Sequence, residues 1–101
     1  MKKAVGLIEV FGMATAYYAA DAACKAGDVT IEAFDRNKPP NADELPVPLL
    51  IMIKIRGSVA DVEAGVEAAA RAAEEIAGVH AKYVIANPSD DMEKFLKISC
   101  L

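Results

Sequence analysis

Leu49-Leu50-Ile51-Met52-Ile53-Lys54-Ile55-Arg56-Gly57-Ser58 is the clearest structural signal in this chain of 101 residues. The apolar run 49–56 predicts a strand that ends at Gly57. Ser58 is a good N-cap for a helix, because its hydroxyl oxygen can accept a hydrogen bond from a free N–H of the first turn. Six apolar residues then recur at steps of three and four and predict an amphipathic helix closed by Gly78: Val59, Val62, Val66, Ala69, Ala73 and Ile76.

The flanking segments predict three more strands, at 4–11, 29–35 and 79–86, and two more helices, at 13–26 and 90–97. The first helix ends in Lys25-Ala26-Gly27, and a cation followed by glycine is typical of a helix C-terminus. Asn87-Pro88 stops the last strand, and Asp90 and Glu93 have the spacing of a capping box for the short final helix. This order predicts one α+β domain, residues 1–101, of the ferredoxin-like split βαβ type. It has a four-stranded antiparallel sheet with two main helices on one face.

A proline-rich segment separates the two middle strands and holds four of the five prolines of the chain. Proline cannot donate to a sheet ladder, so this segment is expected to be a loop outside the core elements. One interpretation is a tolerated hairpin insertion. The other is a gate, lid or docking element, because prolines stiffen a loop at little entropic cost. The predicted loop consists of Arg36, Asn37, Lys38, Pro39, Pro40, Asn41, Ala42, Asp43, Glu44, Leu45, Pro46, Val47 and Pro48.

Composition excludes several classes of function. Hydrophobic residues make up 54% of the chain, and the many alanines favour close, flat packing of helices on a sheet over a deep ligand cavity. The net charge of −4 argues against binding to nucleic acid, because phosphate contacts need a basic surface. No apolar run approaches the ~18 residues of a membrane span. Cys24 and Cys100 have neither metal-site spacing nor a disulfide framework, which favours a reducing cytosol.

Residues that could carry catalysis are scarce. His80 is the single histidine, and a lone histidine in a strand favours packing or surface exposure over a role as base or ligand. Cys24, on an alanine-rich helix, is expected to be buried, and Cys100, next to the chain end, to be mobile. Arg71 is an i,i+4 partner for Glu67 and Glu75 on a solvated helix face. No catalytic residue, metal site or cofactor is therefore assigned.

Four short motifs follow one another along the chain: Gly6-Leu7-Ile8-Glu9-Val10-Phe11-Gly12; Ala19-Ala20-Asp21-Ala22 with Lys25-Ala26; Ile55-Arg56-Gly57-Ser58-Val59-Ala60-Asp61-Val62; and Val84-Ile85-Ala86-Asn87-Pro88 with an acidic turn after it. Each motif alone is weak, but their order makes the chain resemble the shell proteins of bacterial microcompartments, the BMC-domain proteins. The resemblance runs from about residue 4 to residue 97.

This resemblance implies a structural shell subunit and not an enzyme. It implies a cyclic homohexamer that tiles, with other shell proteins, into the shell of a microcompartment in the bacterial cytoplasm. The segment 36–48 would line a central pore for small metabolites. Lys25 would lie at the hexamer edge, where its long side chain could reach backbone carbonyls of a neighbour. Neither nucleic acid nor membrane is an expected partner.

Two departures from the family pattern affect what the resemblance implies. The usual pore loop is short and rich in glycine, whereas this one is longer and proline-rich, so the transported metabolite does not carry over. The arginine used at hexamer contacts is replaced by Asn87, which implies altered lattice packing. Some shell proteins hold an iron–sulfur cluster on cysteines near the pore. This loop has no cysteine, so no cluster is expected.

An alternative is a trimeric, nucleotide-binding signalling regulator of the PII-like type. Such proteins share the split βαβ plan and carry a long loop between the second and third strands. Against this alternative, the chain lacks a basic cluster suited to phosphate, and Lys54 and Arg56 are its only suitable cations. A small enzyme is a third hypothesis, which lacks a paired acid and base.

Overall fold

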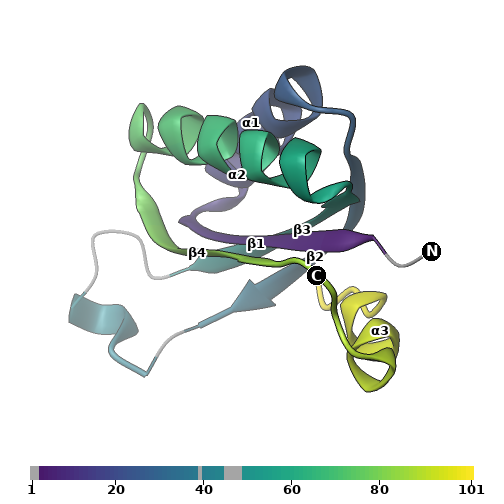
Figure 1. Ribbon diagram of the computed structural model, residues 1–101. Helices are drawn as coiled ribbons and strands as arrows, with labels where there is room; N and C mark the ends of the chain where they lie inside the picture. The colour runs from purple at the N-terminus through teal and green to yellow at the C-terminus, as the bar shows by residue number, and fades with distance from the viewer. Residues whose placement is uncertain (1–2, 39, 45–48) are drawn as a thin grey trace.

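The computed structural model describes residues 3–38, 40–44 and 49–101 (Figure 1). The elements are β1 (Ala4–Phe11), α1 (Met13–Ala26), β2 (Thr30–Asn37), a 3-10 helix (Ala42–Glu44), β3 (Leu50–Gly57), α2 (Val59–Glu74), β4 (Val79–Ile85) and α3 (Asp90–Leu96). Five residues of the predicted loop, Pro39 and residues 45–48, lie outside the described residues. No helix among the described residues is both long and apolar enough to span a membrane.

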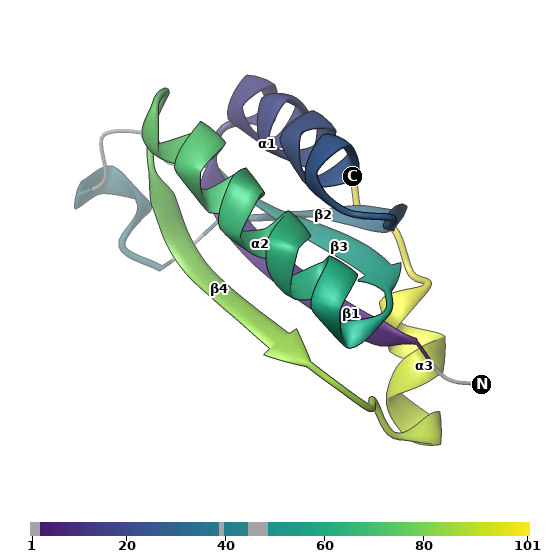
Figure 2. The same ribbon diagram turned by 45° about the horizontal axis from the view of Figure 1, so that its top comes forward.

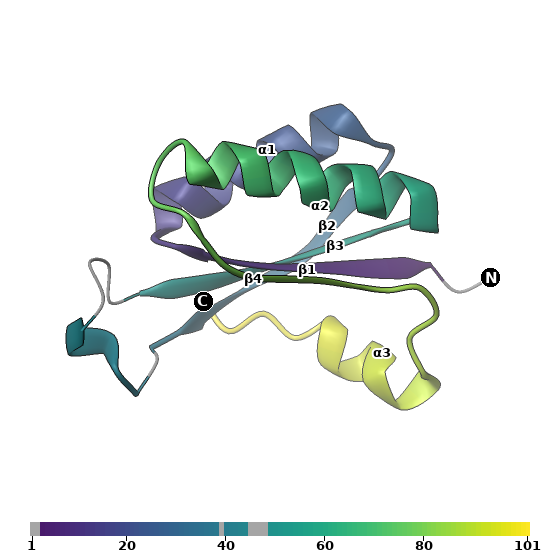
Figure 3. The same cartoon turned by 60° about the vertical axis from the view of Figure 1, so that its left-hand side comes forward.

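One antiparallel sheet forms the centre of the molecule, with the strand order β2-β3-β1-β4. The helices α1 and α2 lie side by side on one face of this sheet, and α3 lies on the opposite face (Figures 2 and 3). This arrangement is the predicted ferredoxin-like plan, so the fold class is confirmed. We call the face that carries α3 the open face, because the two main helices do not cover it.

The core lies between the sheet and the two main helices. Strand β3 contributes Ile51, Ile53 and Ile55, which alternate along the strand and have no exposed surface. Alanines make up most of the buried residues of α1 and of the second half of α2, and such small side chains allow close packing. The predicted N-cap is also confirmed, because the Ser58 hydroxyl accepts a hydrogen bond from the Asp61 N–H at 3.1 Å.

The second strand ends later than predicted. Arg36 and Asn37, assigned to the loop from sequence, continue β2 and pair with Ile51 and Leu50 of β3. Neither residue is a proline or glycine, so the strand can extend until its partner strand ends. Ala42, also in the predicted loop, is buried, with 4% of its surface exposed. The prediction that all of 36–48 lies outside the packed structure is therefore wrong at these three positions.

Several local predictions about side chains are also wrong. Helix α3 begins at Asp90 with Ser89 as its N-cap, so Asp90 is the first helical residue and not the predicted N-cap, and Glu93 pairs with Arg56. Cys24 is exposed, because it lies on the solvent side of α1. The backbone of Cys100 is hydrogen-bonded to β2 and not free.

The expected ion pairs along α2 are replaced by contacts between elements. Glu67 accepts a hydrogen bond from Lys82 of β4 at 2.9 Å, and Glu75 accepts one from the hydroxyl of Tyr18 of α1 at 2.9 Å. The predicted i,i+4 pairing of Arg71 with these two carboxylates is therefore wrong. Spacing along one helix cannot show which side chains a neighbouring element brings closer.

Candidate functional site

The structure places the predicted functional residues at two opposite ends of the sheet. The predicted loop leaves β2 and enters β3 where Leu50 pairs with Asn37 and with Phe11. Asn87 follows β4 at the other end, where Val5 pairs with Ile85. The C-terminus of α1, which carries Lys25, also lies at that end (Figure 3). Lys25 and Asn87 therefore share one end of the molecule, and the described residues of the loop lie at the other.

Lys25 is highly exposed, with 76% of its side chain accessible. Its ammonium group forms an ion pair with Asp21, one turn earlier on α1, at 2.7 Å. This hydrogen bond raises the pKa of Lys25 above its ordinary value, so the side chain stays charged at neutral pH. Asn87 is exposed as well, while the following Pro88 is fully buried and anchors the turn. Both side chains are accessible to a neighbouring molecule.

The described part of the loop exposes charges of both signs. Arg36 and Lys38 lie at its β2 end, and Asp43 and Glu44 lie in the short 3-10 helix. That helix is closed by a hydrogen bond from the Glu44 N–H to the Asn41 carbonyl oxygen at 2.9 Å. The described loop surface is therefore polar, structured around Ala42, and close to neutral in charge.

Sequence reasoning missed a buried lysine on the open face of the sheet. The ammonium group of Lys54 lies 2.6 Å from the Asp35 carboxylate and donates to the carbonyl oxygens of Ile98 at 2.8 Å and Phe95 at 3.4 Å. Only 7% of its side chain is exposed. These three partners use all the donor capacity of an ammonium group.

A second buried cation lies two residues further along β3. The guanidinium group of Arg56 binds both carboxylate oxygens of Glu93, at 2.9 and 2.8 Å, and lies 3.6 Å from Glu32. It also donates to the carbonyl oxygens of Ala4 and Lys3. The hydrogen bonds to Glu93 raise the pKa of Arg56 above its already high ordinary value. This cluster ties α3 to the open face.

One sequence signal for both clusters was present. Lys54 and Arg56 alternate with Ile53 and Ile55 in a strand that is otherwise apolar. Side chains alternate between the two faces of a sheet, so both cations belong on the face opposite the isoleucines. The acidic partners could not be identified in the same way, because they come from β2 and α3.

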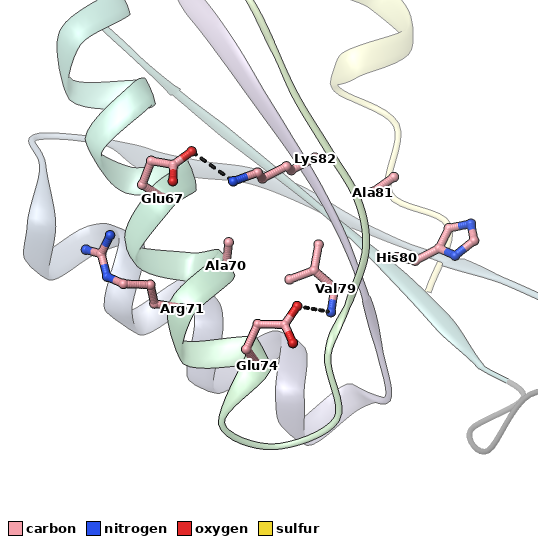
Figure 4. Close-up of a pocket in the computed structure, with 8 residues that line it drawn as sticks. All are labelled: Glu67, Ala70, Arg71, Glu74, Val79, His80, Ala81 and Lys82. Atoms are coloured by element: carbon pink, nitrogen blue, oxygen red, sulfur yellow. Dashed lines mark hydrogen bonds and ion pairs between the residues drawn. The ribbon is translucent and has the colours of Figure 1, made fainter.

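An open groove of about 520 Å³ lies between the second half of α2 and β4 (Figure 4). Lys82 and Glu67 form an ion pair across it, and Glu74 accepts a hydrogen bond from the Val79 N–H at 3.3 Å. The His80 ring points away from the groove and packs edge-on against Phe11, with ring centroids 5.8 Å apart. The groove therefore does not bring an acid, a base and a nucleophile together. Among the described residues there is also no group of three or more side chains that could hold a metal ion.

Comparison with known proteins supplies the family. The sequence profile described as BMC domain matches residues 4–88, which include all four strands and both main helices. The chain is 35% identical to the carboxysome shell protein CcmK3 of Halothece sp. strain PCC 7418, over 98% of this chain and 90% of that protein. It is 32% identical to the bacterial microcompartment shell protein PduA of Citrobacter freundii, over 94% of this chain and 92% of that protein.

A solved structure shows the same fold. The crystal structure of a microcompartment protein from Desulfitobacterium hafniense DCB superposes with a TM-score of 0.72 at 25% sequence identity. The match covers 100% of this chain and 50% of that chain, so the present chain spans half the length of that protein. The profile match, the relatives that align along nearly their whole length and the shared fold lead to one conclusion: this chain belongs to the BMC domain family.

Proposed function

We propose that this chain is a structural subunit of a bacterial microcompartment shell, and not an enzyme. The observation that carries the proposal is the BMC domain match over residues 4–88, together with relatives that are named as shell proteins over nearly the same length. In this role the chain assembles into a cyclic homohexamer. The hexamers tile, with other shell proteins, into a closed layer in the bacterial cytoplasm.

The two-ended distribution of the predicted residues supports this geometry. A subunit of a flat ring has an inner end, which faces the axis, and an outer end, which meets the next ring. The chain measures 42 × 28 × 17 Å, so it is long and flat. The described residues of the segment 36–48 lie at one end, and the segment would line the central pore. Lys25 and Asn87 occupy the other end and would contact neighbouring hexamers.

The pore that follows from this placement has a mixed electrostatic character. In a sixfold ring the cations Arg36 and Lys38 and the carboxylates of Asp43 and Glu44 are each repeated six times. The described loop charges nearly cancel within each subunit, so the rim does not present a field of one sign. Such a pore suits the passage of small polar metabolites better than strong selection for anions or for cations.

The nucleotide-binding alternative loses its candidate phosphate ligands. Lys54 is occupied by Asp35 and two backbone carbonyls, and Arg56 is occupied by Glu93 in a bidentate pair. Freeing either cation for a phosphate would leave a partly buried carboxylate without its cation, which costs several kcal/mol. No contact among the described residues favours this function over a shell subunit.

The mass of the assembled particle tests the proposal. Native mass spectrometry of the purified chain is expected to give six copies, and electron microscopy is expected to show a sixfold ring with a central pore. A monomer or a trimer would contradict the proposal. Titration with nucleotides in a calorimeter is expected to give no heat of binding, and a stoichiometric signal would favour the regulator.

A further inference from the structure

The last residues of the chain cross the open face of the sheet and end beside β2. We call residues 98–101 the tail. The Ser99 hydroxyl donates to the carbonyl oxygen of Phe34 at 3.1 Å, and the Cys100 N–H donates to the Asp35 carboxylate at 3.0 Å. In return, the Arg36 N–H donates to the carbonyl oxygen of Cys100 at 3.0 Å, so Cys100 forms a parallel bridge with Asp35. The tail thus borders the last residues of β2 before the loop.

This position matters because β2 is an edge strand. Among the described residues it pairs with β3 on one side only, so the outward N–H and C=O groups near its end have no partner strand in the sheet. The tail supplies partners for two of them, the Phe34 carbonyl and the Arg36 N–H. Without these contacts the end of an edge strand opens easily, and its last pairs fray into the adjoining loop.

Lys54 binds the tail on the open face of the sheet. Its ammonium group donates to the Ile98 carbonyl, at the start of the tail, and also pairs with the Asp35 carboxylate. Asp35 in turn uses Oδ2 for Lys54 and Oδ1 for the Cys100 N–H. The Lys54 side chain is only 7% exposed, so its charge-assisted contacts are stronger than the same contacts on a fully exposed surface. Lys54, Asp35 and the tail therefore act as one latch on the end of β2.

We infer that this latch positions the pore loop, and that Lys54 is its central positioning residue. The direction in which the loop leaves the sheet is set by the last pairs of β2, Arg36 with Ile51 and Asn37 with Leu50. A frayed β2 would lengthen the loop and widen the range of positions that its tip can reach. The role at a pore rests on the proposed function, whereas the latch itself belongs to a single chain.

Hydrogen exchange of the full chain and two latch variants tests the latch itself. One variant lacks residues 98–101, and the other is Lys54→Met. Loss of the hydrogen bond from the Arg36 N–H is expected to speed its exchange about tenfold in the tail deletion. The matched control is Lys82→Met, which removes an exposed ion pair at the opposite edge of the sheet. Unchanged exchange at Arg36 in the tail deletion would overturn the inference, even if Lys54→Met failed to fold.

Distances between loops in the assembled particle test the effect on the pore. Asn41 is exposed, and Asn41→Cys can carry a spin label in a chain with Cys24→Ser and Cys100→Ser, which removes the two free thiols. The distribution of distances between labels is expected to broaden in the tail deletion and in Lys54→Met, while the mass of the hexamer stays unchanged. If the latch only stabilises the fold, the distance distributions should stay as narrow as in Lys82→Met. That result would overturn the positioning role. A parent chain that is not hexameric would instead contradict the proposed function, while the exchange at Arg36 would still decide the latch.

Discussion

Gly6 shows how closely α2 approaches the sheet. It lies in β1 beneath α2, and a Cβ atom at this position would lie 2.6 Å from Val66 and 2.9 Å from both Val62 and Ile55. Contacts this short force neighbouring side chains out of their preferred rotamers. We expect Gly6→Ala to lower the free energy of unfolding by about 1–3 kcal/mol, as overpacking of a filled core does.

Urea denaturation followed by circular dichroism measures this change. Thr30→Ala, at an exposed position at the start of β2, is the control and should change stability little. An unchanged midpoint for Gly6→Ala would mean that the two valines move aside without cost, and that α2 does not pack on β1 as tightly as the structure indicates.

Tyr18 links the two main helices at their outer surface and gives the fold a dependence on alkaline pH. Its hydroxyl donates to Glu75 at 2.9 Å, and this hydrogen bond and the adjacent negative charge raise the pKa of Tyr18. Lys25 and Asp21 act on the same hydroxyl more weakly and in opposite directions. A raised pKa in the folded state means that folding favours the protonated phenol. The hydrogen bond thus contributes fully to the stability of the fold below the ordinary tyrosine pKa of about 10. This contribution is lost as the pH rises through the raised pKa of the folded state.

Tyr18→Phe removes this titration. We expect the melting temperature of the parent chain to fall toward that of Tyr18→Phe as the pH is raised from about 9 to above 10. Tyr17→Phe, which changes the neighbouring ring that packs on Phe34, should keep the alkaline loss. If the melting temperatures of the parent chain and of Tyr18→Phe changed with pH in parallel, the hydrogen bond to Glu75 would not persist in solution.

At the scale of elements, the end of β2 separates the loop from the sheet and defines how much of the loop is removable. Replacing residues 38–48 with a short Gly-Ser turn keeps Arg36 and Asn37 in the ladder. We expect a loss of less than about 1 kcal/mol in the free energy of unfolding, because loop length affects closure entropy only weakly. Extending the replacement back to Arg36 removes two strand pairs and one contact with the tail, so it should lower the free energy of unfolding further.

Thermal unfolding of the two loop variants makes the comparison. Equal losses would show that Arg36 and Asn37 do not act as part of β2. A large loss for the shorter replacement would mean that buried Ala42 holds part of the core, contrary to the expectation for a loop.

Local sequence signals explain which element boundaries were predictable. The bounds of β1 and α1 agree with the prediction because Gly12 and Gly27 break the chain on either side of α1. The end of β2 lacks such a breaker and depends on where β3 begins, which is a contact between distant parts of the chain. The tail gave no signal for the same reason, because Ser99 and Cys100 bind residues 65 positions earlier.

At the scale of the whole molecule, the sheet register separates the loop from Lys25 and Asn87. The element order was sufficient to predict the fold, since few topologies accommodate it. It could not show that an apolar strand carries two cations that hold α3 and the tail, because Asp35 and Glu93 reach Lys54 and Arg56 only through tertiary packing. The family motifs, and not the physical pattern, supplied the expectation of a ring.

Contacts between neighbouring rings would involve Lys25. The exposed Lys25 side chain forms an ion pair with Asp21 of its own helix, so Lys25→Ala should leave folding and the hexamer intact. At the outer end of the subunit its side chain would donate hydrogen bonds to a neighbouring ring. Losing one such bond of about 1.4 kcal/mol corresponds to roughly a tenfold decrease in sheet formation at fixed concentration. Native mass spectrometry would measure the ring and electron microscopy the sheets, with Lys94→Ala on α3 as a control for loss of one exposed cation. Loss of the ring in Lys25→Ala, or an equal loss of sheets in Lys94→Ala, would contradict a role at the edge.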